Sequence, residues 1–118
     1  MPTDGGGRQE ELLPLTESTF YILISLARPR HGYGIIQAVR EMSGGRVELG
    51  PGTLYGALNR LLRQGLIART EEDEGAQDER RKLYVLTARG RDLLRLEIER
   101  LRAMVRHGEK ALGEGDGE

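Results

Sequence analysis

Residues 50–67, GPGTLYGALNRLLRQGLI, decide the fold. They predict a helix with Pro51 at its first position, where the missing N–H of proline is harmless, and with Gly65 just past its end. Its inward face is a stripe of four leucines at helical spacing, Leu54, Leu58, Leu61 and Leu62. The opposite face of the helical wheel carries Gly52, Gly56, Arg60 and Arg63, flanked by Thr53 and Asn59. We therefore expect the solvent side of this helix to present two cations beside two residues that have no side chain.

The outward face of this helix has the chemistry of a DNA-reading surface. An arginine, Arg60 or Arg63, can donate two hydrogen bonds to guanine, and Asn59 can read adenine. Gly52 and Gly56 let the helix backbone approach a phosphate or a base edge closely, and the preceding turn presents free N–H groups to an anion. Any one of these residues alone is also compatible with an ordinary solvated helix face. Their combination favours nucleic-acid binding.

Two helices are predicted before residue 50. The first occupies the densely apolar residues 12–28, with Thr16 as its N-cap and Pro29 as its end. The second follows the HGYG motif and ends at a pair of glycines. Its apolar residues recur at helical spacing, and they are Ile35, Ile36, Val39 and Met42. We interpret the tyrosine of the HGYG motif, Tyr33, as a core or groove-flanking residue.

After Gly65 the hydrophobic period changes from that of a helix to that of strands. Residues 66–71 and 81–86 predict a two-stranded hairpin around the polar tip EEDEGAQDER. Cations at the base of such a wing suit a DNA backbone, and they are Arg69, Arg80, Arg81 and Lys82. The acidic residues 71–74 would meet phosphates with the wrong sign, so we expect the tip to face solvent and not to enter a minor groove.

A fourth helix, residues 87–112, has Thr87 as its cap. Its apolar residues follow a heptad-like spacing that only Gly108 interrupts, and they are Leu94, Ile98, Leu101, Val105 and Leu112. A stripe this long, on a helix that projects past a small domain, predicts burial against a partner. We therefore expect a homodimer whose interface contains Leu94, Ile98, Leu101 and Val105 together with Phe20 of the first helix.

Length and charge agree with one small domain that binds an anionic partner. The chain has 118 residues, no cysteine and a formal net charge of -1. Residues 28–69 contain seven arginines and two glutamates, which leaves that segment at +5 and the rest of the chain at -6. Genomic base composition is an alternative explanation for the preference for arginine over lysine, but it does not explain the clustering. A basic segment in a nearly neutral chain indicates an anion at one face.

Other functional classes find no support in the sequence. His31 and His107 lie in different elements without ligand spacing, so we expect no metal and no cofactor. GPGTLYG lacks the Gly-Lys-Ser/Thr of a nucleotide-binding loop, and no catalytic triad can be nominated, so we expect no enzyme activity. No apolar run reaches the roughly 20 residues of a membrane span, and the N-terminus has no signal-peptide pattern. We expect a cytoplasmic protein without membrane association.

The predicted order of elements is that of a mainly α winged helix-turn-helix with a small β-hairpin wing, followed by a C-terminal dimerisation helix. Residues 1–11 and 113–118 are rich in glycine and charge, and we expect both to be flexible tails. Residues 12–86 form the predicted DNA-binding domain, and residues 87–112 form the predicted dimerisation helix.

Several motifs in this order resemble the PadR family of bacterial transcriptional regulators. They are LTESTFYILISLA, HGYGI, GPGTLYGALNRLLRQGLI, DERRKLYVLTARG and the long terminal helix, and they span about residues 12–108. The chain is similar to the short subfamily, which has a single C-terminal helix in place of a helical domain. The resemblance implies a homodimer built from that helix with help from the first helix, bound to a palindromic operator in double-stranded DNA. Most members of the family repress transcription.

The resemblance also implies roles for single residues. It places Thr53 and Tyr55 near DNA phosphates at the start of the recognition helix, Arg81 and Lys82 in the wing, and Gly90 where the wing packs onto the last helix. Some short members bind flat apolar compounds at the dimer centre through aromatic side chains. The last helix of this chain has no aromatic residue. That composition favours an aliphatic effector, or none, and the seam between the last and first helices is where an effector would act.

Our hypothesis from the sequence is a homodimeric, sequence-specific DNA-binding regulator that acts as a repressor. The alternative is a dimeric winged-helix module that binds another protein and does not bind DNA specifically. The two hypotheses differ in whether Arg60 and Arg63 face solvent on the same side of the dimer in both protomers.

Overall fold

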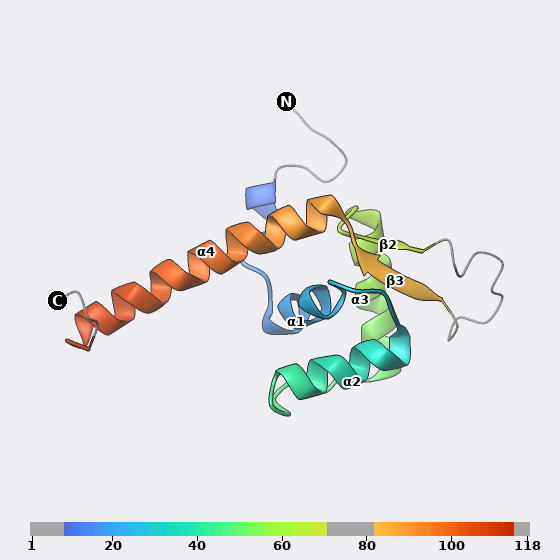
Figure 1. Ribbon diagram of the computed structural model, residues 1–118, viewed down its shortest axis with the longest axis horizontal. Helices are drawn as coiled ribbons and strands as arrows, with labels where there is room; N and C mark the ends of the chain where they lie inside the picture. Colours follow the sequence, from blue (N-terminus) through green and yellow to red (C-terminus); the bar gives the residue numbers. More distant parts are fainter. Residues whose placement is uncertain (1–8, 71–81, 115–118) are drawn as a thin grey trace.

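Four α-helices and a three-stranded sheet make up the part of the chain that the computed structural model describes, residues 9–70 and 82–114. The helices are α1 (Glu17–Ser25), α2 (Gly32–Met42), α3 (Pro51–Arg63) and α4 (Ala88–Ala111). The strands are β1 (Arg30–His31), β2 (Ile67–Arg69) and β3 (Leu83–Leu86), and a short 3-10 helix, η1 (Gln9–Leu12), precedes α1. Figure 1 shows α1, α2, α3 and the sheet gathered together, with α4 extending away from them.

Threonine side chains cap α1 and α4, as the sequence predicts. The Thr16 hydroxyl accepts a hydrogen bond from the Thr19 N–H at 3.1 Å, and the Thr87 hydroxyl accepts one from the Gly90 N–H at 3.0 Å. Each bond satisfies an amide that the first turn of a helix leaves without a partner. The predicted helix that begins at Pro51 and ends before Gly65 is confirmed as α3, which spans Pro51–Arg63.

α1 is shorter than expected, because it ends at Ser25 and does not reach Pro29. The N–H groups of Leu26 and Ala27 bond to carbonyls three residues back, which tightens the last turn. The Leu26 carbonyl then accepts the N–H of Leu86 at 2.8 Å. The helix therefore ends where its backbone becomes bonded to β3, before the proline.

The predicted pair of strands is confirmed as β2 and β3, and a third strand that the sequence does not predict, β1, completes an antiparallel sheet in the order β1-β3-β2. β3 lies in the centre, and its Tyr84 is opposite Arg30 of β1 and Arg69 of β2. β1 has only two residues, too few to show the alternating pattern by which strands are recognised. The predicted acidic tip of the wing lies in residues 71–81, outside the described residues.

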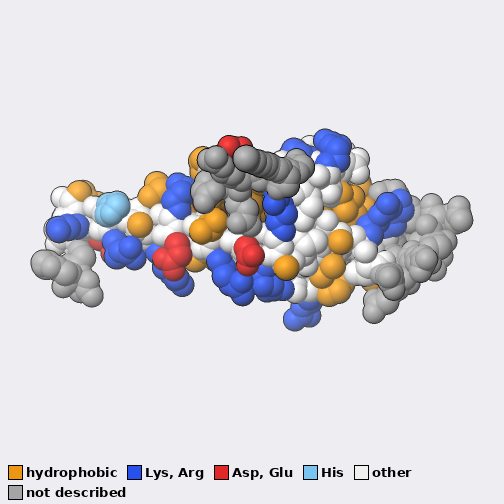
Figure 2. Space-filling view, turned by 90° about the horizontal axis from the view of Figure 1, so that it is seen from above, with side chains coloured by type: hydrophobic (Ala, Val, Ile, Leu, Met, Phe, Trp, Pro, Cys, Tyr) orange, Lys and Arg blue, Asp and Glu red, His pale blue; other side chains and the backbone are white. Residues whose placement is uncertain are grey.

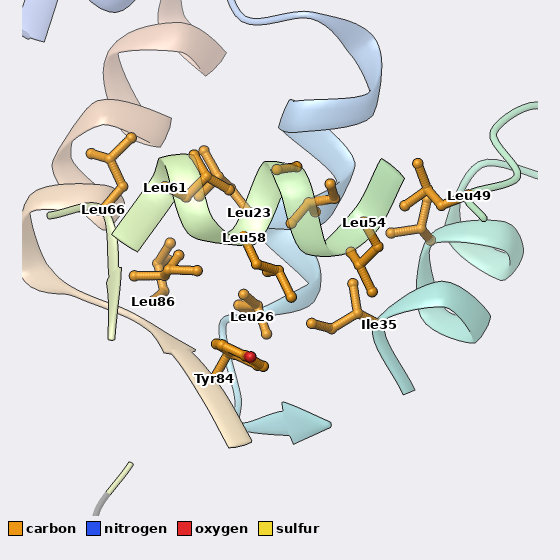
Figure 3. Close-up of a cluster of buried hydrophobic side chains, with 14 of the residues drawn as sticks. Leu23, Leu26, Ile35, Leu49, Leu54, Leu58, Leu61, Leu66, Tyr84 and Leu86 are labelled. Carbon is orange, nitrogen blue, oxygen red and sulfur yellow. The ribbon is translucent and has the colours of Figure 1, made fainter. Parts of the chain in front are cut away.

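The core lies between α1, α2, α3 and the sheet (Figure 3). Three leucines of the predicted inward stripe of α3, Leu54, Leu58 and Leu61, are at most 1% exposed, and the fourth, Leu62, is half-buried. β3 adds Tyr84, which is 2% exposed. Burial of side chains of this size contributes about 1.5–3 kcal/mol each. The inward face of α3 therefore stabilises the domain, and its outward face is left for other contacts.

Three helices and a small antiparallel sheet form the winged helix-turn-helix that the sequence predicts, with α3 in the position of the recognition helix. Gly90 is buried at the start of α4, where a Cβ would collide with the carbonyl oxygen of Leu66. This close approach of α4 to the chain at the start of the wing fits the packing that the family resemblance implies for Gly90.

α4 lies in two environments along its length. Leu93 is fully buried and Leu94 is 6% exposed, so its first turns complete the core of the domain. Leu94, which we expected at a partner interface, instead packs inside its own chain. Farther along, Leu101 is 36% exposed and Val105 is 57% exposed. This later part of α4 projects beyond the domain (Figure 1).

A buried carboxylate holds the segment before α1 onto α4. Glu97 is 1% exposed, and its Oε2 accepts the N–H of Leu15 at 3.0 Å. Its two oxygens also accept hydrogen bonds from Arg100 at 2.6 and 2.9 Å. The Arg100 bonds lower the pKa of Glu97 against the opposing effect of burial, and the Leu15 amide lowers it further. In the same segment, residues 9–12, most of which we assigned to the tail, form η1.

Candidate nucleic-acid interface

The outward face of α3 is exposed to solvent. The four polar side chains that we expected to contact DNA from this face are all exposed, and they are Thr53, Asn59, Arg60 and Arg63. Gly52 and Gly56 lie on the same face, and a Cβ added to either would meet no atom within 4 Å. The structure thus brings the predicted polar and glycine residues of this helix together on one surface.

The two glycines on this face have no role in the packing of the domain. Glycine in a helix interior costs about 0.5–1 kcal/mol relative to alanine, and neither Gly52 nor Gly56 has a positive φ that would favour glycine. By contrast, Gly32 and Gly90 are required by the fold, because a Cβ at either position would collide with neighbouring atoms. Close approach by another molecule is a physical reason for bare backbone at Gly52 and Gly56.

Arg60 and Arg63 carry positive charge that the domain does not neutralise. Within residues 9–70 and 82–114, neither side chain takes part in an ion pair or a hydrogen bond. Other arginines of the basic segment are compensated, since Arg40 pairs with Glu48 and Arg46 pairs with Glu17. The face of α3 therefore keeps the charge that attraction to an anionic partner requires.

Two tyrosines near the contact of α2 and α3 differ in their exposure. Tyr33 is 70% exposed at the start of α2, so of the two positions expected for it, core or groove-flanking, the core position is wrong. Tyr55 is half-buried, and its hydroxyl lies so close to Gly32 that no side chain fits there. Tyr55 fills the space between α2 and α3 and fixes how they pack, whereas Tyr33, the residue after Gly32, lies in solvent.

The base of the wing contributes further cations. Arg69 at the end of β2 is exposed, and Lys82 just before β3 is half-buried. His31 Nδ1 lies 3.2 Å from the carbonyl oxygen of Lys82, and this contact links the start of α2 to the wing. Arg80 and Arg81, which we also expect to contact DNA, lie outside the described residues.

A second exposed surface, on α4, is apolar. An open groove of about 460 Å³ is lined by Phe20, Ile98, Leu101, Arg102, Val105 and Arg106. It brings together the residues predicted for the dimer interface, except Leu94. Met104 is 54% exposed on the same projecting part, and sequence analysis overlooked it although it lies one turn from Leu101. Figure 2 shows hydrophobic side chains along this arm, bordered by lysine and arginine.

Within the described residues, no three His, Cys, Asp or Glu side chains are grouped so that they could hold a metal ion. His31 belongs to β1 and His107 to α4. None of the helices in this part of the chain has the length and apolar character needed to cross a membrane.

Residues 21–96 match the model of the transcriptional regulator PadR-like family. The chain belongs to this family. The match extends from α1 through the wing into α4, and it confirms the family resemblance seen in the motifs. The family and the fold are those of transcriptional regulators and not of enzymes.

Two curated proteins show how this PadR-like regulator relates to longer chains. The transcriptional regulator YqjI of Escherichia coli (strain K12) is 34% identical over 87 residues, which make up 73% of this chain and 40% of YqjI. An uncharacterized 37.1 kDa protein in transposon TN4556 of Streptomyces fradiae is 43% identical over 82 residues, 69% of this chain and 22% of that protein. The chain therefore spans less than half the length of both relatives.

Solved structures of similar proteins share the fold. A PadR family transcriptional regulator from Eggerthella lenta DSM 2243 has a TM-score of 0.60 at 26% identity, with 92% of this chain and 87% of that chain covered. RosR of H. salinarum has a TM-score of 0.61 at 25% identity, with 86% and 98% covered. A transcriptional regulator from Clostridium thermocellum has a TM-score of 0.61 at 21% identity, with 80% of this chain and 87% of that chain covered. This similarity supports the fold and no further property.

Proposed function

We propose that this PadR-like regulator binds a palindromic operator in double-stranded DNA as a homodimer and represses transcription there. The observation that carries the proposal is the outward face of α3. On that face Arg60 and Arg63 have no protein partner among the described residues, and they lie beside the bare backbone of Gly52 and Gly56. Arginine in the major groove reads guanine with two hydrogen bonds, and bare backbone permits the close approach that such contacts need.

Within this proposal the contacts divide into two kinds. Asn59, Arg60 and Arg63 contact base edges and supply sequence specificity, because they lie along the exposed face of α3. Thr53 at the start of α3 and Lys82 in the wing contact phosphates and supply affinity that does not depend on sequence. Arg80 and Arg81 belong to the same proposed phosphate-contacting set. Tyr55 acts indirectly, since its position beside Gly32 holds α3 against α2.

The partner that we propose for the apolar groove of α4 is a second copy of this chain. Leu101 and Val105 are exposed at heptad-like spacing on a projecting helix, a pattern that pairs with its own copy about a two-fold axis. Two recognition helices placed about 34 Å apart enter successive turns of the major groove on one side of DNA. Each copy of α3 would then read one half of a palindrome.

Selection of binding sequences from random double-stranded DNA by the purified full chain tests this function. The expected result is an enriched pair of inverted half-sites with centres about 10 base pairs apart, or a multiple of that spacing. Arg60→Ala should lose the preference at one position of each half-site. A chain that is dimeric but enriches no sequence would favour the alternative function, a winged-helix module that binds another protein.

A reporter assay tests the sign of regulation. When the selected site is placed over a promoter, the bound dimer should lower reporter expression, because it occludes the polymerase. The Arg60→Ala variant should restore expression at an equal protein level. An increase in expression with the wild-type chain would identify an activator and contradict repression.

A further inference from the structure

A second pocket lies between the segment that precedes α1 and the C-terminal half of α3. Its volume is about 360 Å³, near the lower end of the range of about 300–1,000 Å³ typical of small-molecule sites. Apolar side chains line one part of it, and they include Leu12, Leu15, Leu61 and Leu66. Polar side chains line the other part, and they are Thr16, Thr19, Arg60 and Gln64. The pocket therefore suits a small ligand that has one polar end and one apolar end.

The polar end of this pocket is suited to an anion. None of its described lining residues is acidic, and Arg60 has no partner among the described residues. Thr19 is 9% exposed, and its hydroxyl accepts the hydrogen bond of the Thr16 hydroxyl at 2.9 Å, which leaves its own hydrogen to donate. The carboxylate of Glu17, the residue after Thr16, is paired with Arg46 at 2.7 Å. The pocket thus combines donors with a positive charge, and the carboxylates of Glu17 and Glu97 beside it are paired with arginines outside its lining, Arg46 and Arg100.

One wall of the pocket is hydrogen-bonded to α4, and the other wall is part of α3. One wall contains Leu15, whose N–H is bonded to Glu97 of α4 at 3.0 Å. The other wall is α3 itself, through Arg60, Leu61 and Gln64. A ligand in this pocket would therefore contact both the segment fixed to α4 and the helix in the recognition position.

We propose that this pocket binds a small carboxylate with a short apolar chain, that the carboxylate pairs with Arg60, and that binding withdraws Arg60 from DNA. The chain of the ligand lies against Leu61 and Leu66. The effect on DNA rests on the proposed function, since it requires Arg60 to contact DNA. A ligand changes DNA affinity only if it binds the free and DNA-bound states differently. Competition for one guanidinium group supplies that difference.

Titration of the full chain with sodium hexanoate, in the absence of DNA, tests the pocket directly. Amide chemical shifts should change saturably at Thr16, Thr19 and Gln64. Hexanamide, the neutral analogue of the same length, should bind at least about tenfold more weakly, because it lacks the charge that strengthens hydrogen bonds to arginine. Arg60→Ala should weaken hexanoate binding by about tenfold or more for the same reason. Arg63→Ala, on the same helix but outside the pocket lining, should bind hexanoate like the wild type.

Any of three outcomes would refute the proposal that this pocket binds a carboxylate. The first is equal binding of hexanoate and hexanamide, and the second is a set of amide chemical-shift changes confined to the groove around Phe20 and Val105. The third is the absence of saturable binding of butanoate, hexanoate and octanoate.

A second measurement tests the effect on DNA. Saturating hexanoate should weaken operator binding, and DNA should weaken hexanoate binding by the same factor, because such coupling is reciprocal. If hexanoate binds and DNA affinity is unchanged, the proposal that the ligand withdraws Arg60 from DNA is refuted. If the chain binds no DNA at all, the proposed function is refuted, and the titration without DNA still tests whether the pocket binds a carboxylate.

Discussion

Replacement of Gly56 by alanine should raise the stability of the protein and lower its affinity for DNA. The added methyl group meets no atom within 4 Å, and Gly56 has no positive φ, so no strain opposes the higher helix propensity of alanine. The expected gain in the free energy of unfolding is about 0.5–1 kcal/mol. In a domain of this size the gain corresponds to an increase in Tm of about 2–8 °C.

The same methyl group should obstruct the approach of DNA. If the backbone of α3 lies in van der Waals contact with a base or a sugar at Gly56, the new Cβ forces the helix outward. An extra methyl group in a packed contact costs about 1–3 kcal/mol. That cost corresponds to a loss of about 5-fold to 150-fold in DNA affinity. The two effects of one substitution therefore have opposite signs.

Urea unfolding of the free protein and fluorescence anisotropy with the selected operator measure the two effects separately. Gly108→Ala is the matched control for the stability effect alone, because Gly108 is also helical and also surrounded by open space in the single chain. It should gain stability. Gly32→Ala should lose stability, since its Cβ would collide with Tyr55. If Gly56→Ala bound the operator as tightly as the wild type, our explanation of the bare α3 face would be refuted.

Three other predictions concern the dimer, the DNA contacts and the buried carboxylate. Leu101→Asp should shift the dimer towards monomer in sedimentation experiments, because it places one charge per chain in an apolar seam; a wild-type monomer at micromolar concentration would contradict the dimer itself. Arg60→Ala should reduce the binding free energy by about 1–3 kcal/mol for the operator but not for random DNA. Lys82→Ala should weaken binding to every DNA sequence and reduce the slope of log affinity against log salt concentration by about one unit. If Arg60→Ala weakened binding to the operator and to random DNA equally, Arg60 would be a phosphate contact. Glu97→Gln should lower the free energy of unfolding at neutral pH by about 1.5–3 kcal/mol. Because the folded-state pKa of Glu97 lies below its ordinary value of 4.5, its contribution is present above that value and is lost as the pH falls through the folded-state pKa. The pH dependence of unfolding should therefore be flatter in the variant, and a parallel profile would contradict this role.

The elements that sequence analysis predicts correctly are those in which one local pattern determines the structure. α3 is defined by proline at its start, glycine after its end and leucines at helical spacing, and all three signals lie within residues 50–67. The caps Thr16 and Thr87 depend on residues three positions away. The outward position of Arg60 and Arg63 follows from the same helical geometry, so the candidate interface on α3 could be predicted from the sequence.

The features that the sequence does not predict depend on contacts between distant parts of the chain. Glu97 has a polar side chain in a helix that is mostly exposed, and it is buried where it accepts a hydrogen bond from the N–H of Leu15, which is 82 residues away. Leu94 fits the heptad-like pattern of an interface, but the first turns of α4 happen to lie over their own domain. Tyr55 of another helix occupies the space beside Gly32, and the next residue, Tyr33, lies in solvent. None of these arrangements leaves a periodic signal.

α4 is one continuous helix whose first turns belong to the domain core and whose later turns carry the exposed apolar face. The direction of that face relative to α3 is therefore set by the number of residues between Glu97 and Leu101. One inserted residue would rotate the later turns by about 100° and displace them by about 1.5 Å. Seven inserted residues would nearly restore the direction and lengthen the arm by about 10.5 Å. In a dimer joined through this face, the length and angular phase of α4 would determine which half-site spacing can be bound, without any change in a residue that touches DNA.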